Sequence, residues 1–187
     1  MKFAHLCRPK SGESLCGDAV GIFGTEANRL FAVLDGLGHG PEANEACQKA
    51  LEFIGPAWEE DLETIIWGSH EHVRDTRGLA LFLCRFSDGE KKLLECAGIG
   101  NVEFKAFGDS TIAPFPRDGV VGHRVRKVSS FHYGYGEGGT FAVFTDGIHA
   151  SFNLANVAHL EPPQAAQDIL EKYGKDYDDA TILLVRT

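Results

Sequence analysis

The chain has 187 residues and a formal net charge of -9, with 43% hydrophobic and 24% charged residues. This length and balance are typical of a globular protein with a substantial core, and we expect one domain over residues 1–187. The negative charge argues against nucleic acid or anionic lipid as a partner. No segment approaches the roughly 20 apolar residues of a membrane span. No basic stretch leads into an apolar signal core, so we expect a cytoplasmic protein with no membrane partner.

The chain opens with a strand pair and a helix. Apolar residues at 18–25 and 30–34 flank a short turn, which predicts an antiparallel hairpin. Pro41 suits the first turn of a helix, and Glu42 and Glu45 suit its positive end. A buried helix face is then indicated by apolar residues at helical spacing, namely Ala43, Ala46, Cys47, Ala50 and Ile54.

A second helix and three strands are expected next. Apolar residues line one stripe of residues 58–67, which predicts an amphipathic helix. The pattern then changes to strands at 79–86, 92–97 and 102–107, for which successive hairpins are the simplest topology.

The last third of the chain is rich in glycine and proline at first and regular at its end. We expect loops over residues 108–140, with one basic strand around 124–128. A helix is predicted over 163–173, ended by Gly174, followed by a last strand at 182–185. Antiparallel strands buried by helices on their outer faces imply an α+β fold, with layers in the order helix, sheet, sheet, helix.

Four aspartate-bearing segments lie where these apolar strands begin or end. Asp18 and Asp178 precede strands, whereas Asp35 and Asp146 follow them. Clustered carboxylates repel one another unless cations lie between them, and hard oxygen ligands favour Mg²⁺ or Mn²⁺. The pattern predicts a carboxylate-held metal centre. The alternative is that Asp-Gly pairs are ordinary turn residues.

The order of the short motifs along the chain carries a family resemblance. In sequence order they are Asp35-Gly36-Leu37-Gly38-His39-Gly40, Thr76-Arg77-Gly78, Gly98-Ile99-Gly100-Asn101, Thr145-Asp146-Gly147-Ile148 and Asp178-Asp179-Ala180-Thr181. With these motifs the chain resembles the PPM (type 2C) metal-dependent protein serine/threonine phosphatases, specifically the SpoIIE branch. Within that branch it is most similar to the RsbX type, which resets stressosome or sigma-factor partner-switching modules.

The resemblance implies a four-layer αββα fold with two Mn²⁺ or Mg²⁺ ions at one end of the sandwich. Asp35 would bridge both ions, and the backbone carbonyl of Gly36 would bind one. Asp18 corresponds to the acidic residue of the first family motif, and Asp146 and Asp178 would bind the other ion. Strand alternation lets only one of Asp178 and Asp179 face the metal directly, and the family pattern favours Asp178. Metal-bound water would attack the phosphorus, so no protein nucleophile is needed.

Two features depart from the family pattern. Larger type 2C enzymes carry an arginine shortly before the first aspartate, whereas the nearest cations here are Arg8 and Lys10, further upstream. Many members place a histidine two residues after the bridging aspartate, but His39 lies four residues after Asp35. His39 would either donate a proton to the leaving oxygen or hydrogen-bond across the strand-to-helix turn, and we favour the second role.

Other polar clusters have simpler interpretations. His70 and His72 are two residues apart, which on a helix points them to different faces, so we expect a solvated helix end and no zinc site. The glycines at 134–139 are followed by a strand and not by a helix, which argues against a nucleotide-binding loop. Basic residues gather at one place only, where they would dock an acidic partner or form a solvated face: Arg117, Arg124, Arg126 and Lys127.

The aromatic and sulfur-containing residues are expected to be structural. Phe131, Tyr133 and Tyr135 would pack beneath the glycine-rich loop or form a recognition patch, and we favour packing. The cysteines are odd in number and lack zinc-ligand spacing, so we expect reduced and mostly buried thiols at Cys7, Cys16, Cys47, Cys84 and Cys96.

The function that the resemblance implies is hydrolysis of phosphoserine or phosphothreonine on STAS-domain signalling proteins. The alternative is a catalytically weak binding module that keeps the fold and regulates a partner by docking. A small-molecule phosphatase or nucleotide hydrolase is a poorer choice, because no base or ribose pocket signature is present.

Overall fold

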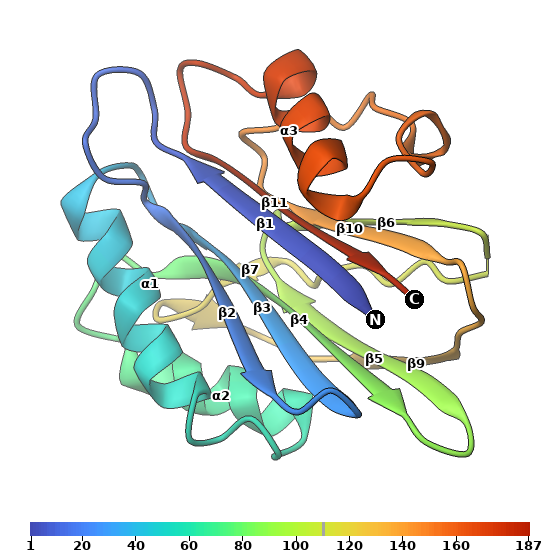
Figure 1. Cartoon of the computed structure of the whole chain (residues 1–187). Coiled ribbons are helices and arrows are strands. Elements are labelled where there is room, and N and C mark those ends of the chain that lie inside the picture. The colour runs from blue at the N-terminus through green and yellow to red at the C-terminus, as the bar shows by residue number, and fades with distance from the viewer. Residues whose placement is uncertain (110) are drawn as a thin grey trace.

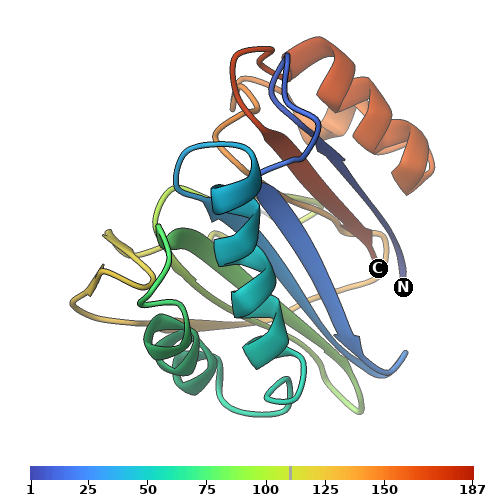
Figure 2. The same cartoon turned by 90° about the vertical axis from the view of Figure 1, so that its left-hand side faces the viewer.

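Two antiparallel β-sheets pack face to face, and helices cover the outer face of each (Figures 1 and 2). The computed structural model describes residues 1–109 and 111–187. The four-layer αββα arrangement predicted from the sequence is confirmed.

The two sheets have different strand orders. One runs β1 (Lys2–Arg8), β11 (Ala180–Arg186), β10 (Thr140–Phe144) and β6 (Glu103–Phe107). The other runs β2 (Asp18–Gly24), β3 (Asn28–Gly36), β4 (Leu79–Asp88), β5 (Lys92–Ile99) and β9 (Ser130–Gly134). A separate ribbon pairs β7 (Gly119–Val120) with β8 (Arg124–Val125).

Helices α1 (Pro41–Ile54) and α2 (Leu62–His72) pack on the five-stranded sheet, and α3 (Pro162–Tyr173) packs on the four-stranded sheet beside a short 3-10 helix, η1 (Leu154–Asn156). All five apolar positions predicted for the buried face of α1 are buried. The final helix ends at Gly174, as predicted. No helix in the described part of the chain has the length and apolar character needed to cross a lipid bilayer.

Strand β3 shows how the layers are built. Its residues Leu30, Ala32 and Leu34 pack toward the helices, whereas Phe31 and Val33 pack between the sheets. This division follows from the two-residue period of a strand. Aromatic rings fill the space between the sheets, and the ring centroid of Phe86 lies 5.9 Å from that of Phe31 in an edge-on arrangement. Such a pair adds about 0.5–1.5 kcal/mol beyond the area that it buries.

The expected run of successive hairpins is wrong at its second turn. Strands β4 and β5 form a hairpin as predicted, but β6 crosses to the other sheet and pairs with β10. The free edge of β5 is already taken by β9 and by Arg117, whose backbone exchanges hydrogen bonds with Gly98 (2.8 Å) and Gly100 (2.9 Å). Residues that are remote in sequence therefore pair with the edge of β5 in place of β6, the next strand along the chain.

The second helix begins later than predicted, at Leu62 and not at residue 58. The buried guanidinium of Arg85 donates through Nη2 to the backbone carbonyls of Trp58 (2.7 Å) and Glu60. These carbonyls would otherwise accept helical hydrogen bonds, so a tertiary contact holds residues 57–60 as turns.

Three further expectations need correction. The first strand, β1, was not predicted, although it pairs along its full length with β11. The predicted basic strand at 124–128 shortens to the two residues of β8, and β9 follows it. His70 is buried and not solvated: its Nδ1 accepts from the Gly122 amide at 3.0 Å, and burial lowers its pKa. His72 is exposed, as expected.

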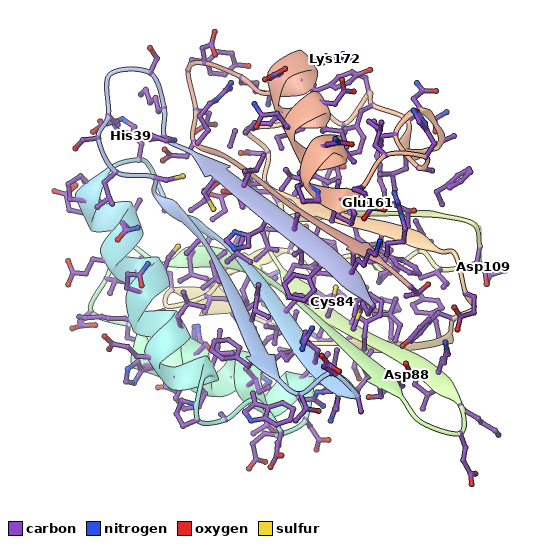
Figure 3. All side chains as sticks on the ribbon, viewed as in Figure 1. His39, Cys84, Asp88, Asp109, Glu161 and Lys172 are labelled. Atoms are coloured by element: carbon purple, nitrogen blue, oxygen red, sulfur yellow. The ribbon has the colours of Figure 1, made fainter. Side chains whose placement is uncertain are left out.

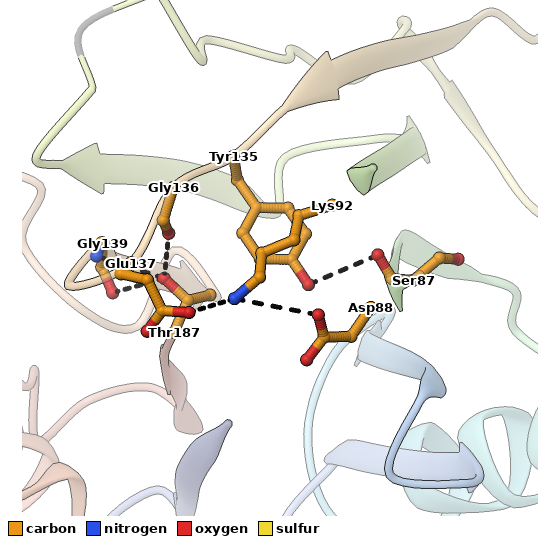
Figure 4. Close-up of polar contacts among 8 residues, drawn as sticks. All are labelled: Ser87, Asp88, Lys92, Tyr135, Gly136, Glu137, Gly139 and Thr187. Carbon is orange, nitrogen blue, oxygen red and sulfur yellow. Dashed lines mark hydrogen bonds and ion pairs between the residues drawn. The ribbon is translucent and has the colours of Figure 1, made fainter. Parts of the chain in front are cut away.

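The glycine-rich segment after β9 is held by polar contacts with the β4–β5 hairpin and with the last residue of the chain (Figure 4). Lys92 pairs with Glu137 and with Asp88, and the Thr187 hydroxyl donates to the Gly136 carbonyl at 2.7 Å. Tyr135 is buried beneath this segment, so the packing role predicted for it is confirmed. Three cysteines are buried and all are free, but Cys7 is exposed and Cys16 is half-buried.

Candidate metal centre

The predicted aspartates lie at the strand ends of both sheets. Asp18 begins β2 and lies directly opposite Asp35 near the end of β3. Opposite residues of an antiparallel pair share one face, with Cβ atoms about 4.5–5.5 Å apart. In the other sheet Asp146 follows β10 and Asp178 precedes β11. The two sheets therefore bring all four to one region of the molecule.

An open cavity of about 280 Å³ lies among these strand ends. Its lining residues are Asp35, Leu37, Gly38, His39, Asn101, Asp146 and Asp178. Asp18 and Gly36 are buried and are not among these residues. A larger cavity of about 490 Å³ lies against β6, but none of the described residues that line it carries a carboxylate. The smaller cavity is therefore the one lined by three of the aspartates predicted to bind metal, Asp35, Asp146 and Asp178.

Asp18 is held by a hydrogen-bond chain between the two sheets. Its Oδ2 accepts from the hydroxyl of buried Thr145 at 2.8 Å. The Thr145 hydroxyl oxygen in turn accepts from the backbone amide of Thr181 at 2.9 Å. The first strand of one sheet is thereby joined to β11 of the other through a single threonine.

Asp178 and Asp179 have different surroundings. Asp179 is buried, and its two carboxylate oxygens accept from the backbone amides of Lys10 (2.8 Å) and Gly17 (2.9 Å). Asp178 lines the cavity and accepts from the backbone amide of Asp179 at 3.0 Å. Asp179 therefore fastens the loop between β1 and β2, whereas the Asp178 carboxylate borders open space.

Burial and then neighbouring charges raise the pKa values of Asp18, Asp35 and Asp178. Burial, then the charges of Asp18, Asp146 and Asp178, raise the pKa of Asp35 to about 8. Burial raises the pKa of Asp18 to about 7, although the hydrogen bond from Thr145 opposes the rise. Burial and the charge of Asp146 raise the pKa of Asp178. Within residues 1–109 and 111–187, no three His, Cys, Asp or Glu side chains form a converged metal site. Their oxygen donors and mutual repulsion nevertheless fit divalent cations.

The sequence and structure of this chain are similar to those of known proteins. No family model matches the sequence. It is 28% identical over 182 residues to the phosphoserine phosphatase RsbX of Bacillus subtilis (strain 168), covering 94% of this chain and 89% of RsbX. A structure from work on the bacterial stressosome as a modular system has 30% identity and a TM-score of 0.93, over 99% of this chain and 98% of the other. A crystal structure of RsbX in complex with magnesium has 25% identity and a TM-score of 0.86, over 97% and 92% of the two chains.

The chain belongs to the PPM phosphatases and is related to RsbX. Membership in this family makes it a phosphatase of the metal-dependent class.

His39 of this PPM phosphatase does not bond across its own turn. Its Nδ1 lies 2.8 Å from Oε1 of Glu13, on the loop between β1 and β2. His39 lies at one end of the sandwich, with Asp88 and Asp109 at the other (Figure 3). The expectation of a bond across the strand-to-helix turn is replaced by a contact with a different loop.

Sequence reasoning assigned no role to three polar residues of this phosphatase. Asn101 donates to Oδ2 of Asp146 at 2.7 Å and lines the cavity. Thr145 holds Asp18, and Glu13 contacts His39. Asn101 and Thr145 lie in motifs of the family pattern, and these motifs were the signal in the sequence that could have pointed to a role for them at the site. For Glu13 the sequence held none.

Asp35→Asn should stabilise this phosphatase when cations are removed. A raised carboxyl pKa favours the folded state at low pH. The stabilising contribution of Asp35 to the free energy of unfolding is therefore fully present below its ordinary pKa and is lost as pH rises through about 8. Removing the charge should therefore raise the free energy of unfolding by about 1–3 kcal/mol near pH 8, with a smaller gain near pH 5. Urea denaturation in EDTA measures this, and exposed Asp176→Asn is the control. An equal effect of the two substitutions would contradict the prediction.

Proposed function

We propose that this chain is a cytoplasmic phosphatase, with one PPM domain over residues 1–187, that removes phosphate from phosphoserine or phosphothreonine of STAS-domain signalling proteins. The observation that carries the proposal is the open cavity bordered by Asp35, Asp146 and Asp178, where burial and then neighbouring charges raise the carboxyl pKa values of Asp35 and Asp178. Its relatives support the substrate class, because one is a phosphoserine phosphatase and another was solved in work on the stressosome.

Two divalent cations, Mn²⁺ or Mg²⁺, are the proposed cofactors. Asp18, Asp35, Asp146, Asp178 and the Gly36 carbonyl would hold them, and the magnesium complex of RsbX supports this class of ion. Bound cations would lower the pKa of water and neutralise charge on the phosphoryl group. Asp178 is a better ligand candidate than Asp179, because the backbone already occupies both oxygens of Asp179.

The protein's own groups would orient this centre. Asn101 fixes one carboxylate oxygen of Asp146, and Thr145 fixes one of Asp18. Among the described residues that line the cavity there is no serine, threonine or cysteine, which supports attack by water and not by a side chain. A weakly active binding module would not require these carboxylates to remain together at an open surface.

Partner choice is proposed to depend on the protein surface. The cavity is open and small, so it offers little contact beyond the phosphoryl group and its neighbours. The β7–β8 ribbon presents the exposed side chains of Arg124 and Arg126 on an otherwise acidic protein. These arginines border a hollow of about 330 Å³ and would attract an acidic partner surface.

Asp35→Asn and Asp146→Asn should each abolish Mn²⁺-dependent hydrolysis of para-nitrophenyl phosphate, by at least about 100-fold, since ligand loss weakens both metal binding and water activation. EDTA should silence the wild type, and Mn²⁺ or Mg²⁺ should restore it. Ca²⁺ should restore little, because its looser shell positions water poorly. Near-normal turnover by either variant at saturating Mn²⁺ would refute the role of that residue.

Asp178→Asn and Asp179→Asn should fail in different ways. Asp178→Asn should lose activity but keep the stability of the fold, because its carboxylate borders the cavity. Asp179→Asn should lower the free energy of unfolding by about 1–3 kcal/mol, because it weakens the acceptor of two backbone amides, the buried one of Gly17 and the half-buried one of Lys10. Thermal denaturation and Mn²⁺ titration of the pair measure this. The opposite pattern would exchange the two roles.

Charge reversal at Arg124 and Arg126 should lower kcat/KM for a phosphorylated STAS-domain protein by roughly tenfold while sparing para-nitrophenyl phosphate. The difference should shrink as salt rises, because exposed charges are screened. Charge reversal at Lys91, exposed at the β4–β5 turn, is the control. Equal losses on both substrates would indicate damage to the catalytic centre, and no loss on either would make the ribbon a solvated face.

A further inference from the structure

Arg77 lies against the loop that forms one wall of the carboxylate cavity. Gly38 lines this cavity with a φ of 93°, and a Cβ placed on it would lie 2.8 Å from Nη1 of Arg77. The Arg77 guanidinium therefore occupies the space that the side chain of any residue other than glycine would take at position 38. A positive group thus lies beside the wall of a cavity whose charged carboxylates would repel a phosphate dianion.

The backbone of Arg77 is fixed from two directions. The adjacent Gly78 carbonyl accepts from the amide of Leu37 at 3.0 Å, which ties this segment to the cavity loop. The Arg77 carbonyl lies 2.8 Å from Nε2 of His123, at the turn of the β7–β8 ribbon. Arg77 consequently lies between the candidate metal centre and the basic ribbon.

The side chain of Arg77 remains free to change partner. It pairs with Glu42 on α1 at 3.1 Å, but 48% of the Arg77 side chain and 63% of the Glu42 side chain are exposed. An exposed ion pair of this kind contributes little free energy. A phosphoryl group offers the guanidinium two oxygens in a matching fork, which is a stronger interaction.

Two other cations, Arg8 and Lys175, donate to backbone carbonyls. Arg8 donates to the Lys175 carbonyl at 3.0 Å, and Lys175 donates to the Asp146 carbonyl. Both contacts hold the loop between α3 and β11. Arg77, by contrast with Arg8 and Lys175, has the exposed Glu42 carboxylate as its side-chain partner among the described residues.

We propose that Arg77 binds the phosphoryl group of the substrate at the rim of the cavity and that Glu42 competes with phosphate for it. This inference rests on the proposed phosphatase function and names a substrate-binding residue for it. Arg77→Ala should then raise KM for para-nitrophenyl phosphate and Kd for inorganic phosphate, each by roughly 10- to 100-fold. Arg77→Lys should recover part of the loss, because a lysine keeps the charge but not the fork.

Glu42→Gln gives an independent test, because it removes the competitor and leaves Arg77 in place. Phosphate should bind this variant more tightly than the wild type. The matched controls are Arg74→Ala and Glu71→Gln, which break a comparable exposed ion pair of 2.7 Å at the end of α2. Neither control should change phosphate affinity.

The experiment measures phosphate binding by calorimetry and by phosphate-induced thermal stabilisation of the Mn²⁺-loaded protein, alongside steady-state kinetics. Weaker binding in Arg77→Ala with tighter binding in Glu42→Gln supports the inference. Unchanged phosphate affinity in both variants would overturn it. A wild type that binds phosphate but has no Mn²⁺-dependent hydrolysis would instead refute the proposed function, because the binding comparison still reports on Arg77.

Discussion

Repulsion among carboxylates at the meeting edge of two sheets is the constraint on which the rest of this structure depends. Burial and neighbouring charge raise the pKa values of Asp18 and Asp35. In the protein without cations, this arrangement of ionised carboxylates therefore costs free energy of folding. Such an arrangement persists only where the surrounding structure stabilises it. Its chemical value is that the same oxygen donors suit divalent cations.

The surrounding structure stabilises this edge by neutral and backbone contacts. Thr145 donates to Asp18 and accepts from Thr181, which joins β2 to β11 across the sandwich. Asp179 takes two backbone amides of the loop between β1 and β2. Close packing completes the support: a Cβ at Gly147 would lie 1.8 Å from the Asp179 carbonyl oxygen, so only glycine fits there. The carboxylates that border the cavity thus differ from those that accept hydrogen bonds from Thr145 and from the backbone of the loop between β1 and β2.

An open acidic cavity has a consequence for recognition. Bound cations would reverse the local charge, but they would attract the phosphoryl group of any substrate. They would therefore not distinguish one phosphorylated substrate from another. Selectivity must then come from groups around the cavity, on α1, on the segment before β4 and on the β7–β8 ribbon. The contact between His123 and the Arg77 carbonyl couples the ribbon to that segment mechanically. Phosphoryl binding and partner docking thus depend on adjoining parts of one surface.

The sequence by itself determined the layers and predicted the acidic residues of the candidate site, because helical and strand periodicity and the ordered motifs are local signals. It predicted the α1 face at Ala43 and Cys47 and the hairpin that brings Asp18 opposite Asp35. Pairing between remote segments was decided only by the tertiary structure. Arg85 delays α2, Arg117 helps exclude β6 from the edge of β5, and β1 is recognisable only through its partner β11. The different surroundings of Asp178 and Asp179, and the guanidinium of Arg77 over Gly38, likewise arise from contacts between distant residues, which no local pattern specifies.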